Sequence, residues 1–282
     1  MWQMTEHQAC ERVRSLVRQL KEEYNLSSNL HYQGIDDPVA KRLQVKIKHG
    51  NLPQKLGIYL PYTQEGPTII LDAHKQGPER LNFTYFHELT HHLIRQDNNL
   101  YSWIVESQQI DRLLERLCDV GAGEFLLPIS EMQYLIREKG FSIQLIPHID
   151  ELYFASKPSI LVQLLECANH ECYGVICSHG TTPELPMLPS VESQTPIMQV
   201  EFSIASVSAR YSIGRNTTIE RAHPISEAFL LQAAISGKGR IPFKSRTDWK
   251  VDCEALFYKG KVYAIFNATT PNQFNPDQLS FC

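Results

Sequence analysis

The stretch NFTYFHELTHHLIRQ, residues 82–96, decides how the first part of this chain folds, because it has the pattern of a helix with two unlike faces. At about 100° per residue, its apolar residues fall on one side of such a helix, and His87 and His91 fall together on the other. Two imidazoles one turn apart can bind one zinc ion through a nitrogen each. The stretch therefore predicts a packed helix that carries a His-Glu-x-x-His zinc motif.

The other two polar residues of the motif have different predicted roles. Glu88 stands beside such a metal without binding it, and is the expected general base that takes a proton from water. His92 lies about 140° around the helix from His87, away from the metal-binding face. We interpret His92 as a group on the side of the helix, or as a residue that supports the metal ligands.

A catalytic zinc ion needs a third protein ligand and one position left open to water. A second helical pattern, residues 103–127, ends at Pro128 and offers several acidic side chains. These candidates are Glu106, Asp111, Glu115, Asp119 and Glu124. Glu115, Cys118 and Asp119 share one face of that helix at spacings of three and four residues. Spacing alone leaves Glu115 or Asp119 as the third ligand.

Cys118 has two interpretations in this pattern. Its thiolate would lie one turn after Glu115 and could take the open position on the metal, which would silence an enzyme until something displaced it. A free cysteine is also among the most buried residue types and usually only packs. Packing is the expected role, with inhibitory ligation as the alternative.

Composition describes a globular chain of 282 residues that is 43% hydrophobic. It contains no apolar run of about 18 residues and no apolar signal-peptide segment at its start. Seven cysteines, an odd number, fit reduced thiols better than a disulfide framework. The net charge of -4 argues against a surface coated for duplex DNA. We expect a cytoplasmic protein with no membrane partner.

The segments before the motif predict a helix and a hairpin. Residues 5–24 repeat apolar side chains every three or four positions, as an amphipathic helix does. The runs LGIYLPY (56–62) and TIILD (68–72) are rich in β-forming residues and are separated by TQEGP, a turn signal. We expect two paired strands there, with a substrate peptide lying extended along the edge at TIILD.

Residues 130–180 predict a helical region. The segments 130–139, 142–155 and 158–169 are three short helical patterns in an order that resembles a helix-turn-helix. Between residues 141 and 180 the one lysine or arginine is Lys157, so we expect packing or substrate docking there in place of operator binding. At the end of the region, CYGVICSHG alternates like a buried strand, and its cysteines lack the spacing of a zinc knuckle.

Residues 181–196 contain four prolines and read as a linker, and residues 197–282 predict an α+β module. Strand patterns occupy 198–213 and 253–268, with a helix at 225–236. The segment KGRIPFKSRTDWK mixes cations with aromatic rings, a mixture that can bind single-stranded DNA. Its residues are Lys238, Arg240, Phe243, Lys244, Arg246, Trp249 and Lys250. The alternative is a solvated loop with two core aromatics.

The strand TIILD, the helix RLNFTYFHELTHHL and the segment ERLCDVGAGEFLLP together resemble the ImmA/IrrE family of metallopeptidases. Members of that family pair an F-x-x-x-H-E-x-x-H helix with an E-x-x-A-N-x-F segment. Four positions depart from this pattern: Cys118 and Asp119 replace Ala-Asn, Gly121 replaces Phe, and Thr90 replaces the common Gly. These departures make the chain resemble the IrrE branch, which regulates the response to DNA damage.

The resemblance implies a set of expectations. Glu115 is the third ligand beside His87 and His91, with Zn2+ as the metal and Mn2+ as the alternative. The fold class is α+β, with a zincin-like metallopeptidase domain (1–129), a helix-turn-helix-like region (130–180), a linker (181–196) and a GAF-like sensor domain (197–282). His92 and Tyr101 are candidates for stabilising the oxyanion of the reaction.

The resemblance also implies a substrate. This is a helix-turn-helix (XRE-type) repressor, cut at one site to release a DNA-damage or anti-phage operon, with single-stranded DNA as a candidate activator. The alternative is a regulator without enzymatic activity, which binds DNA or a repressor and uses zinc as a structural brace.

Overall fold

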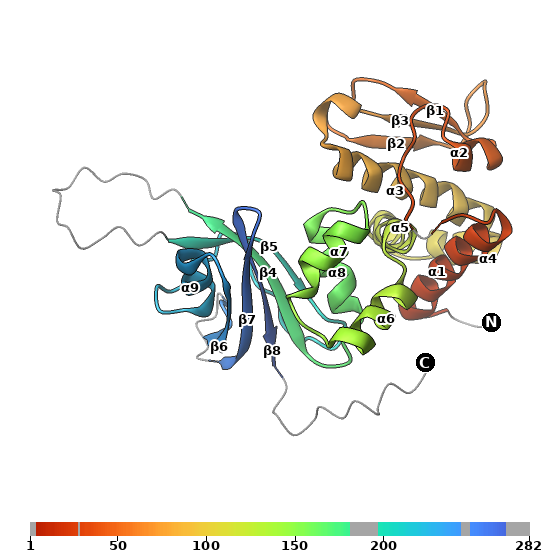
Figure 1. The fold of residues 1–282 in the computed structure, drawn as a ribbon. Helices are drawn as coiled ribbons and strands as arrows, with labels where there is room; N and C mark the ends of the chain where they lie inside the picture. The colour runs from red at the N-terminus through yellow and green to blue at the C-terminus, as the bar shows by residue number, and fades with distance from the viewer. Residues whose placement is uncertain (1–3, 28, 181–196, 244–248, 269–282) are drawn as a thin grey trace. The chain divides into compact units, whose positions relative to one another are not determined.

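The computed structural model describes residues 4–27, 29–180, 197–243 and 249–268 (Figure 1). Contacts within the chain divide it into two units. One comprises Met1–Glu131 and Ile149–Ile160, and the other comprises Met132–His148 and Leu161–Cys282. The predicted zinc motif lies wholly in the N-terminal unit.

The N-terminal unit contains a three-stranded sheet in the order β1-β3-β2. β2 (Gly57–Leu60) and β3 (Thr68–Leu71) form the predicted hairpin, with Ile58 opposite Ile70. β1 (Lys46–His49) was not predicted and pairs parallel to β3. Because β3 is paired on both sides, the expectation that a peptide binds along TIILD is wrong. The strand with the open edge near the motif is β2.

The open edge of β2 presents the backbone groups of Gly57 and Tyr59. The Asp72 N–H donates to the Leu56 carbonyl oxygen at 2.9 Å, in register with the antiparallel pairing. Backbone groups alternate in direction along a strand, so those of Gly57 and Tyr59 turn away from β3. An edge of this kind can accept a further strand.

Helices pack below and beside this sheet. α1 (Glu6–Glu23) begins with a capping box between Thr5 and Gln8 and confirms the predicted helix. α2 (Pro38–Arg42) and a 3-10 turn (Ala73–Lys75) connect the sheet to the helices. α3 (Pro78–Gln96) contains the motif, starts at a proline in its first turn, and contacts β2 and β3 (Figure 1).

The second predicted helix is broken into two. α4 (Asn98–Val105) begins where the Asp97 carboxylate accepts the Leu100 N–H at 3.0 Å. α5 (Ile110–Leu126) follows a turn in which the Ser107 hydroxyl accepts the Gln109 N–H. The Ser107 hydrogen bond offers the backbone an alternative to the helical pattern, so residues 103–127 do not form one helix.

α3 and α5 approach closely where Thr90 meets Gly121. A Cβ atom added to Gly121 would lie 2.4 Å from the Thr90 Cγ2 atom and 2.6 Å from its Oγ1 atom. The Thr90 hydroxyl also donates to the Phe86 carbonyl at 2.8 Å, which holds that side chain in place. Two of the four departures from the ImmA/IrrE pattern are therefore coupled, since the side chain gained at 90 occupies the space given up at 121.

We expect Gly121→Ala to destabilise the N-terminal unit by about 1–3 kcal/mol, because overpacked contacts cost this much. Urea unfolding followed by a probe in that unit measures the loss. The double variant Thr90→Ala, Gly121→Ala should recover part of it, with a coupling energy of about 0.5–3 kcal/mol. Strictly additive losses would show that the two positions do not share one space.

Three short helices follow, as predicted: α6 (Ile129–Lys139), α7 (Leu145–Leu152) and α8 (Lys157–Glu166). Lys157 donates to Glu79 at 2.8 Å and forms an ion pair with Asp150 at 2.9 Å. Its side chain is 14% exposed, so it is not presented to a phosphate backbone. None of the helices within the described ranges is long and apolar enough to cross a membrane.

The C-terminal unit is built on a five-stranded antiparallel sheet in the order β5-β4-β8-β7-β6. Its strands are β4 (Cys172–His179), β5 (Met198–Ala205), β6 (Ala234–Arg240), β7 (Lys250–Tyr258) and β8 (Lys261–Asn267). α9 (Pro224–Leu231) packs against β6, β7 and β8 (Figure 1). The α+β prediction for this part of the chain is confirmed in class.

Two details of that unit differ from the prediction. β4 is the buried strand predicted within 130–180, but it pairs with β5 and β8 and so belongs to the C-terminal sheet. The sheet therefore begins before residue 180. The helix predicted at 225–236 ends at Leu231, because Gln232 has a left-handed φ of 50° and the chain turns into β6.

Candidate metal centre

A cleft of about 460 Å³ lies in the N-terminal unit between the open edge of β2 and the motif face of α3. Residues of β2 and the segment before it form one side, and residues of α3 and α5 form the other. The side chains of the motif that line it are His87, Glu88 and His91, joined by Glu115 and Asp119 of α5. The predicted metal ligands therefore lie close together, beside the open edge of β2.

Three of these side chains direct metal-binding atoms toward one another. The His87 Nε2 atom lies 3.2 Å from one Glu115 carboxylate oxygen, and the His91 Nε2 atom lies 3.6 Å from the other. The histidine side chains are 13% and 15% exposed, whereas that of Glu115 is 61% exposed. A carboxylate that reaches both imidazoles from the solvent side can close a His-His-Glu set around one cation.

Asp119 lies behind His87, at the ring nitrogen that faces away from Glu115. The His87 Nδ1 atom lies 2.9 Å from the Asp119 Oδ1 atom. A carboxylate bonded to the outer nitrogen of a metal-binding histidine fixes the ring and its tautomer. Of the two candidates left open by spacing, Glu115 is the one that contacts both imidazoles, whereas Asp119 contacts the outer nitrogen of His87.

The two histidines of this site have pKa values that are shifted in opposite directions. Burial alone lowers the pKa of His87, but hydrogen bonds to Asp119 and Glu115 outweigh burial and raise that pKa to about 9. Burial and the charge of His87 lower the pKa of His91 to about 4. The hydrogen bond with His87 lowers the pKa of Glu115. An ionised carboxylate beside two imidazoles is a set of ligands that suits a divalent metal.

Glu88 is buried beside the ligands and contacts the open edge strand. The backbone N–H of Tyr59 hydrogen bonds to its carboxylate. Burial raises the pKa of Glu88 to about 7, although the charge of His87 and the Tyr59 bond oppose that change. A carboxyl group with a pKa near neutrality can both accept and return a proton.

Cys118 is a second candidate for the third ligand. Within the described residues, the group of metal-binding side chains with one atom each inside 4.8 Å consists of His87, His91 and Cys118. Glu115 contacts both imidazoles and lines the cleft, whereas Cys118 is fully buried and does not line it. Glu115 thus lies on the cleft side of the two histidines, and Cys118 lies on their buried side.

The two residues proposed for the oxyanion do not reach the cleft. His92 is buried, and its Nδ1 atom lies 2.9 Å from the Tyr59 hydroxyl. Tyr101 accepts a hydrogen bond from Arg95 at 2.8 Å, and Arg95 also stacks on its ring. His92 supports the edge strand through Tyr59, and neither side chain is placed to stabilise an oxyanion.

Several residues that line the cleft were missed from the sequence: Lys55, Gly57, Tyr59, Arg80 and Phe83. A Cβ atom added to Gly57 would lie 2.6 Å from the Thr84 Cγ2 atom and 2.9 Å from the Glu88 carboxylate. A glycine inside a strand often marks such a close approach, so LGIYL contained a usable signal. The other four have no local pattern that marks them.

We expect Asp119→Ala to weaken zinc binding by about 10–100-fold, since losing a partner of a ligating histidine costs this much. Competition with a chromophoric chelator measures the affinity. Asp119→Asn keeps an oxygen acceptor and should stay close to wild type. Asp111→Ala, an exposed aspartate on the same helix, is the matched control. Equal affinities for Asp119→Ala and Asp111→Ala would contradict the role of Asp119.

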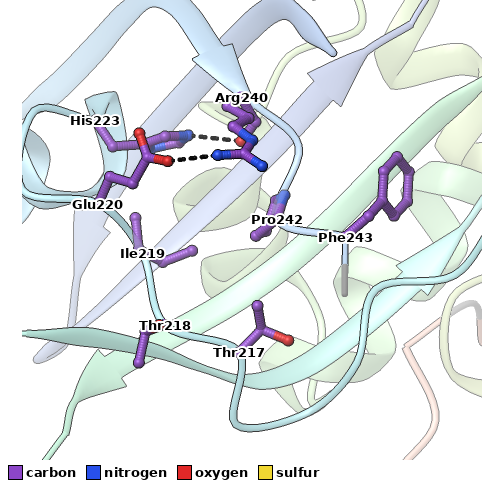
Figure 2. A pocket seen from close by; sticks show the side chains of 8 residues that line it. All are labelled: Thr217, Thr218, Ile219, Glu220, His223, Arg240, Pro242 and Phe243. Atoms are coloured by element: carbon purple, nitrogen blue, oxygen red, sulfur yellow. Dashed lines mark hydrogen bonds and ion pairs between the residues drawn. The ribbon is translucent and has the colours of Figure 1, made fainter. Parts of the chain in front are cut away.

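The predicted DNA patch of the C-terminal unit is only partly described. Arg240 and Phe243 line a cavity of about 450 Å³ there, and Arg240 is paired with Glu220 at 2.8 Å (Figure 2). Phe243 is 9% exposed and packs, like Trp249, in the core of the unit. The packed rings are not presented to stack on bases.

Of the remaining cations of this segment, one is held in an ion pair and one is exposed. Lys238 is paired with Asp252 at 2.7 Å, and Lys250 is exposed on β7. Lys244 and Arg246 lie outside the described residues. The structure thus favours the alternative in which this segment contributes two core aromatics.

A family model, the IrrE N-terminal-like domain Peptidase_M78, matches residues 40–160. The radiation response metalloprotease IrrE of Deinococcus radiodurans is 24% identical over 218 residues, which cover 75% of this chain and 64% of that protein. The protein of the same name from Deinococcus deserti is 26% identical over 219 residues, covering 77% and 76%. The chain thus spans less than two thirds of the length of the first relative.

A solved structure has a similar fold. A Mycobacterium tuberculosis transcriptional regulator superposes with a TM-score of 0.52 at 14% identity, covering 92% of this chain and 81% of that chain. At this identity the match shows a shared fold alone.

Proposed function

We propose that this chain, whose residues 40–160 form an IrrE N-terminal-like domain of the Peptidase_M78 family, is a site-specific metalloendopeptidase that uses zinc. The observation that carries the proposal is the cleft itself. It brings His87, His91 and Glu115 together within 3.2–3.6 Å contacts, beside a buried glutamate and the open edge of a strand. The domain is zincin-like in this arrangement.

His87, His91 and Glu115 would hold the metal. A divalent ion at this position supplies Lewis-acid polarisation of a carbonyl and makes water a better nucleophile. Two imidazoles and a carboxylate favour Zn2+ over Mn2+ by the usual order of affinities, although metal supply in the cell also decides. Asp119 keeps the Nε2 atom of His87 turned toward the cleft.

The peptide binds as an added strand along β2. Gly57 and Tyr59 offer outward N–H and C=O groups, so a peptide in extended form pairs with them and runs past the motif helix. A peptide carbonyl that accepts the Tyr59 N–H takes the place of Glu88 on that donor. Substrate binding then frees the Glu88 carboxylate for the reaction.

Glu88 moves the proton. Its carboxylate removes a proton from water as the scissile carbonyl is attacked, and returns it to the departing amine. Its burial limits contact with bulk water, which would otherwise compete for the proton. Lys55 and Arg80 also line the cleft and are the cations placed to meet negative charge there.

The proposed substrate is a helix-turn-helix (XRE-type) repressor, and its cleavage releases a DNA-damage or anti-phage operon. The relatives' description as radiation response metalloproteases supports this role. Narrow specificity fits a peptidase that acts on one regulator. The C-terminal unit acts in this proposal as a GAF-like sensor, with the cavity beside Arg240 as its binding site and single-stranded DNA as an activator to be tested.

One observation favours a second function. Because Cys118 offers a further metal ligand, the site can close around a structural ion, as expected of a regulator that binds DNA or a repressor without cutting it. The two functions are distinguished by one result: the peptidase cleaves its partner in a reaction that needs Glu88, and the regulator does not cleave it.

The test is co-incubation with the helix-turn-helix protein encoded next to the gene, with Zn2+ or Mn2+ added. Wild type should produce two discrete fragments, and Glu88→Ala should produce none. Chelation should abolish cleavage, and casein should stay intact. If the repressor survives every metal and DNA condition, or if Glu88→Ala cuts it equally well, the peptidase assignment is wrong.

A further inference from the structure

Cys118 lies beside the two motif histidines, on the buried side of the site. Glu115 is three residues before it on α5, so the two side chains project on one face of the helix. One atom each of His87, His91 and Cys118 falls within 4.8 Å of the others. The thiol is therefore part of the same cluster as the predicted ligands.

Cys118 packs in a hydrophobic core, and its sulfur also lies beside the two imidazoles. Cys118 is fully buried, and within the described ranges its thiol has no hydrogen-bond partner. The core beside it contains Leu117 and Ile104, but the sulfur is turned toward the two imidazoles. A cysteine sulfur beside two imidazole nitrogens is a donor set that suits zinc.

The distances permit one ion to reach all of these atoms. Tetrahedral zinc has bonds of about 2.0–2.1 Å to nitrogen and about 2.3 Å to sulfur, so its ligand atoms lie roughly 3.3–3.6 Å apart. Small rotations of the side chains bring a cluster within 4.8 Å to these separations. Glu115 contacts the same imidazoles from the opposite, exposed side.

We propose that Cys118 is a fourth metal ligand, and that the protein without substrate holds its metal in a closed His-His-Cys-Glu set. The proposal rests on the proposed function, since it concerns the same metal. Ligation exchanges the thiol proton for a metal–sulfur bond, and the proton is released to water. No oxidant or reductant is required.

This arrangement makes the site a regulated one. A closed four-ligand set leaves no position for substrate, so the Cys118 sulfur must leave the metal before a peptide is cut. A resting peptidase of this kind does not degrade its partner until substrate or a signal shifts α5 relative to α3. Cys118→Ala, which introduces the residue common in the ImmA/IrrE pattern, removes the block.

The experiment is Co2+ substitution in the full chain, read by absorption. Wild type should show visible bands of tetrahedral cobalt together with an intense near-ultraviolet band of thiolate-to-cobalt charge transfer. Cys118→Ala and Cys118→Ser should keep the visible bands and lose the charge-transfer band. Cys10→Ser, a buried cysteine of the same core that lies outside the cluster, is the matched control and should keep both.

Zinc affinity gives a second measure. We expect Cys118→Ala to bind zinc at least 10-fold more weakly, because even outer partners of metal ligands contribute about 10–100-fold. Visible bands without a charge-transfer band in wild type would overturn ligation by Cys118 and leave the peptidase proposal intact. Failure of wild type to bind cobalt or zinc at all would overturn both.

Discussion

Glu88→Gln should abolish cleavage of the partner repressor while zinc stays bound. Positioned acid–base catalysis contributes about 10²–10⁴-fold to rates, and a loss at the upper end of this range is expected where one carboxylate serves both proton transfers. Glutamine has the same shape and can accept the Tyr59 N–H, so the edge strand should keep its place. Single-turnover cleavage followed by gel electrophoresis measures the change.

Two controls give this experiment its meaning. Zinc content should be unchanged in Glu88→Gln, because Glu88 contacts the ligands without contributing one of the closest metal-binding atoms. Glu106→Gln, on the turn between α4 and α5, changes an exposed carboxylate of the same unit and should cut at the wild-type rate. Residual cleavage within a few-fold of wild type would rule out Glu88 as the general base.

Gly57→Ala should reduce cleavage by about 10²-fold, since displacement of catalytic groups by about 1 Å can cost this much. The new methyl group would lie 2.6 Å from the Thr84 Cγ2 atom and 2.9 Å from the Glu88 carboxylate. Either the edge strand or Glu88 must move, and both are needed in the proposed reaction. Rates of repressor cleavage measure the loss.

Gly77→Ala provides the matched control for that substitution. Gly77 precedes α3 in the same unit, has a negative φ of -69°, and has no atom within 4 Å of an added Cβ atom. Its cleavage rate should stay near wild type. If Gly57→Ala also cuts at that rate, with Glu88 still required, then β2 is not the strand that binds the peptide.

The parts of the site that could be predicted are those set by one helix. The spacing of His87 and His91 fixes a shared face, so their meeting follows from helical geometry alone. The same geometry does not distinguish Glu115 from Asp119 as the third ligand, because both lie on one face of α5. What separates them is the distance to each imidazole ring, which depends on how α5 crosses α3.

The parts that could not be predicted depend on contacts between distant segments. β1 is four residues long with two lysines, so its pairing with β3 leaves little local pattern. That pairing decides which strand is left open at the cleft. The close packing of Thr90 on Gly121 likewise involves residues 31 positions apart, and each alone reads only as a departure from the family pattern.

The C-terminal unit shows the same limit. A strand pattern was predicted at 253–268, and in the structure these residues form parts of two paired strands, β7 and β8. The membership of β4 in that sheet was not predicted, because its partners β5 and β8 lie beyond the segment 181–196 or near the end of the chain. A local pattern predicts that a strand forms, but it does not predict which strands pair with it.

Anomalous diffraction at the zinc edge, from crystals of the wild-type protein grown with Zn2+, shows which side chains bind the metal. We expect one strong peak in the cleft, about 2.0–2.2 Å from the Nε2 atoms of His87 and His91 and from a Glu115 carboxylate oxygen. A peak that does not contact His87, His91 and Glu115, or a cleft that stays free of zinc in such crystals, would contradict this assignment.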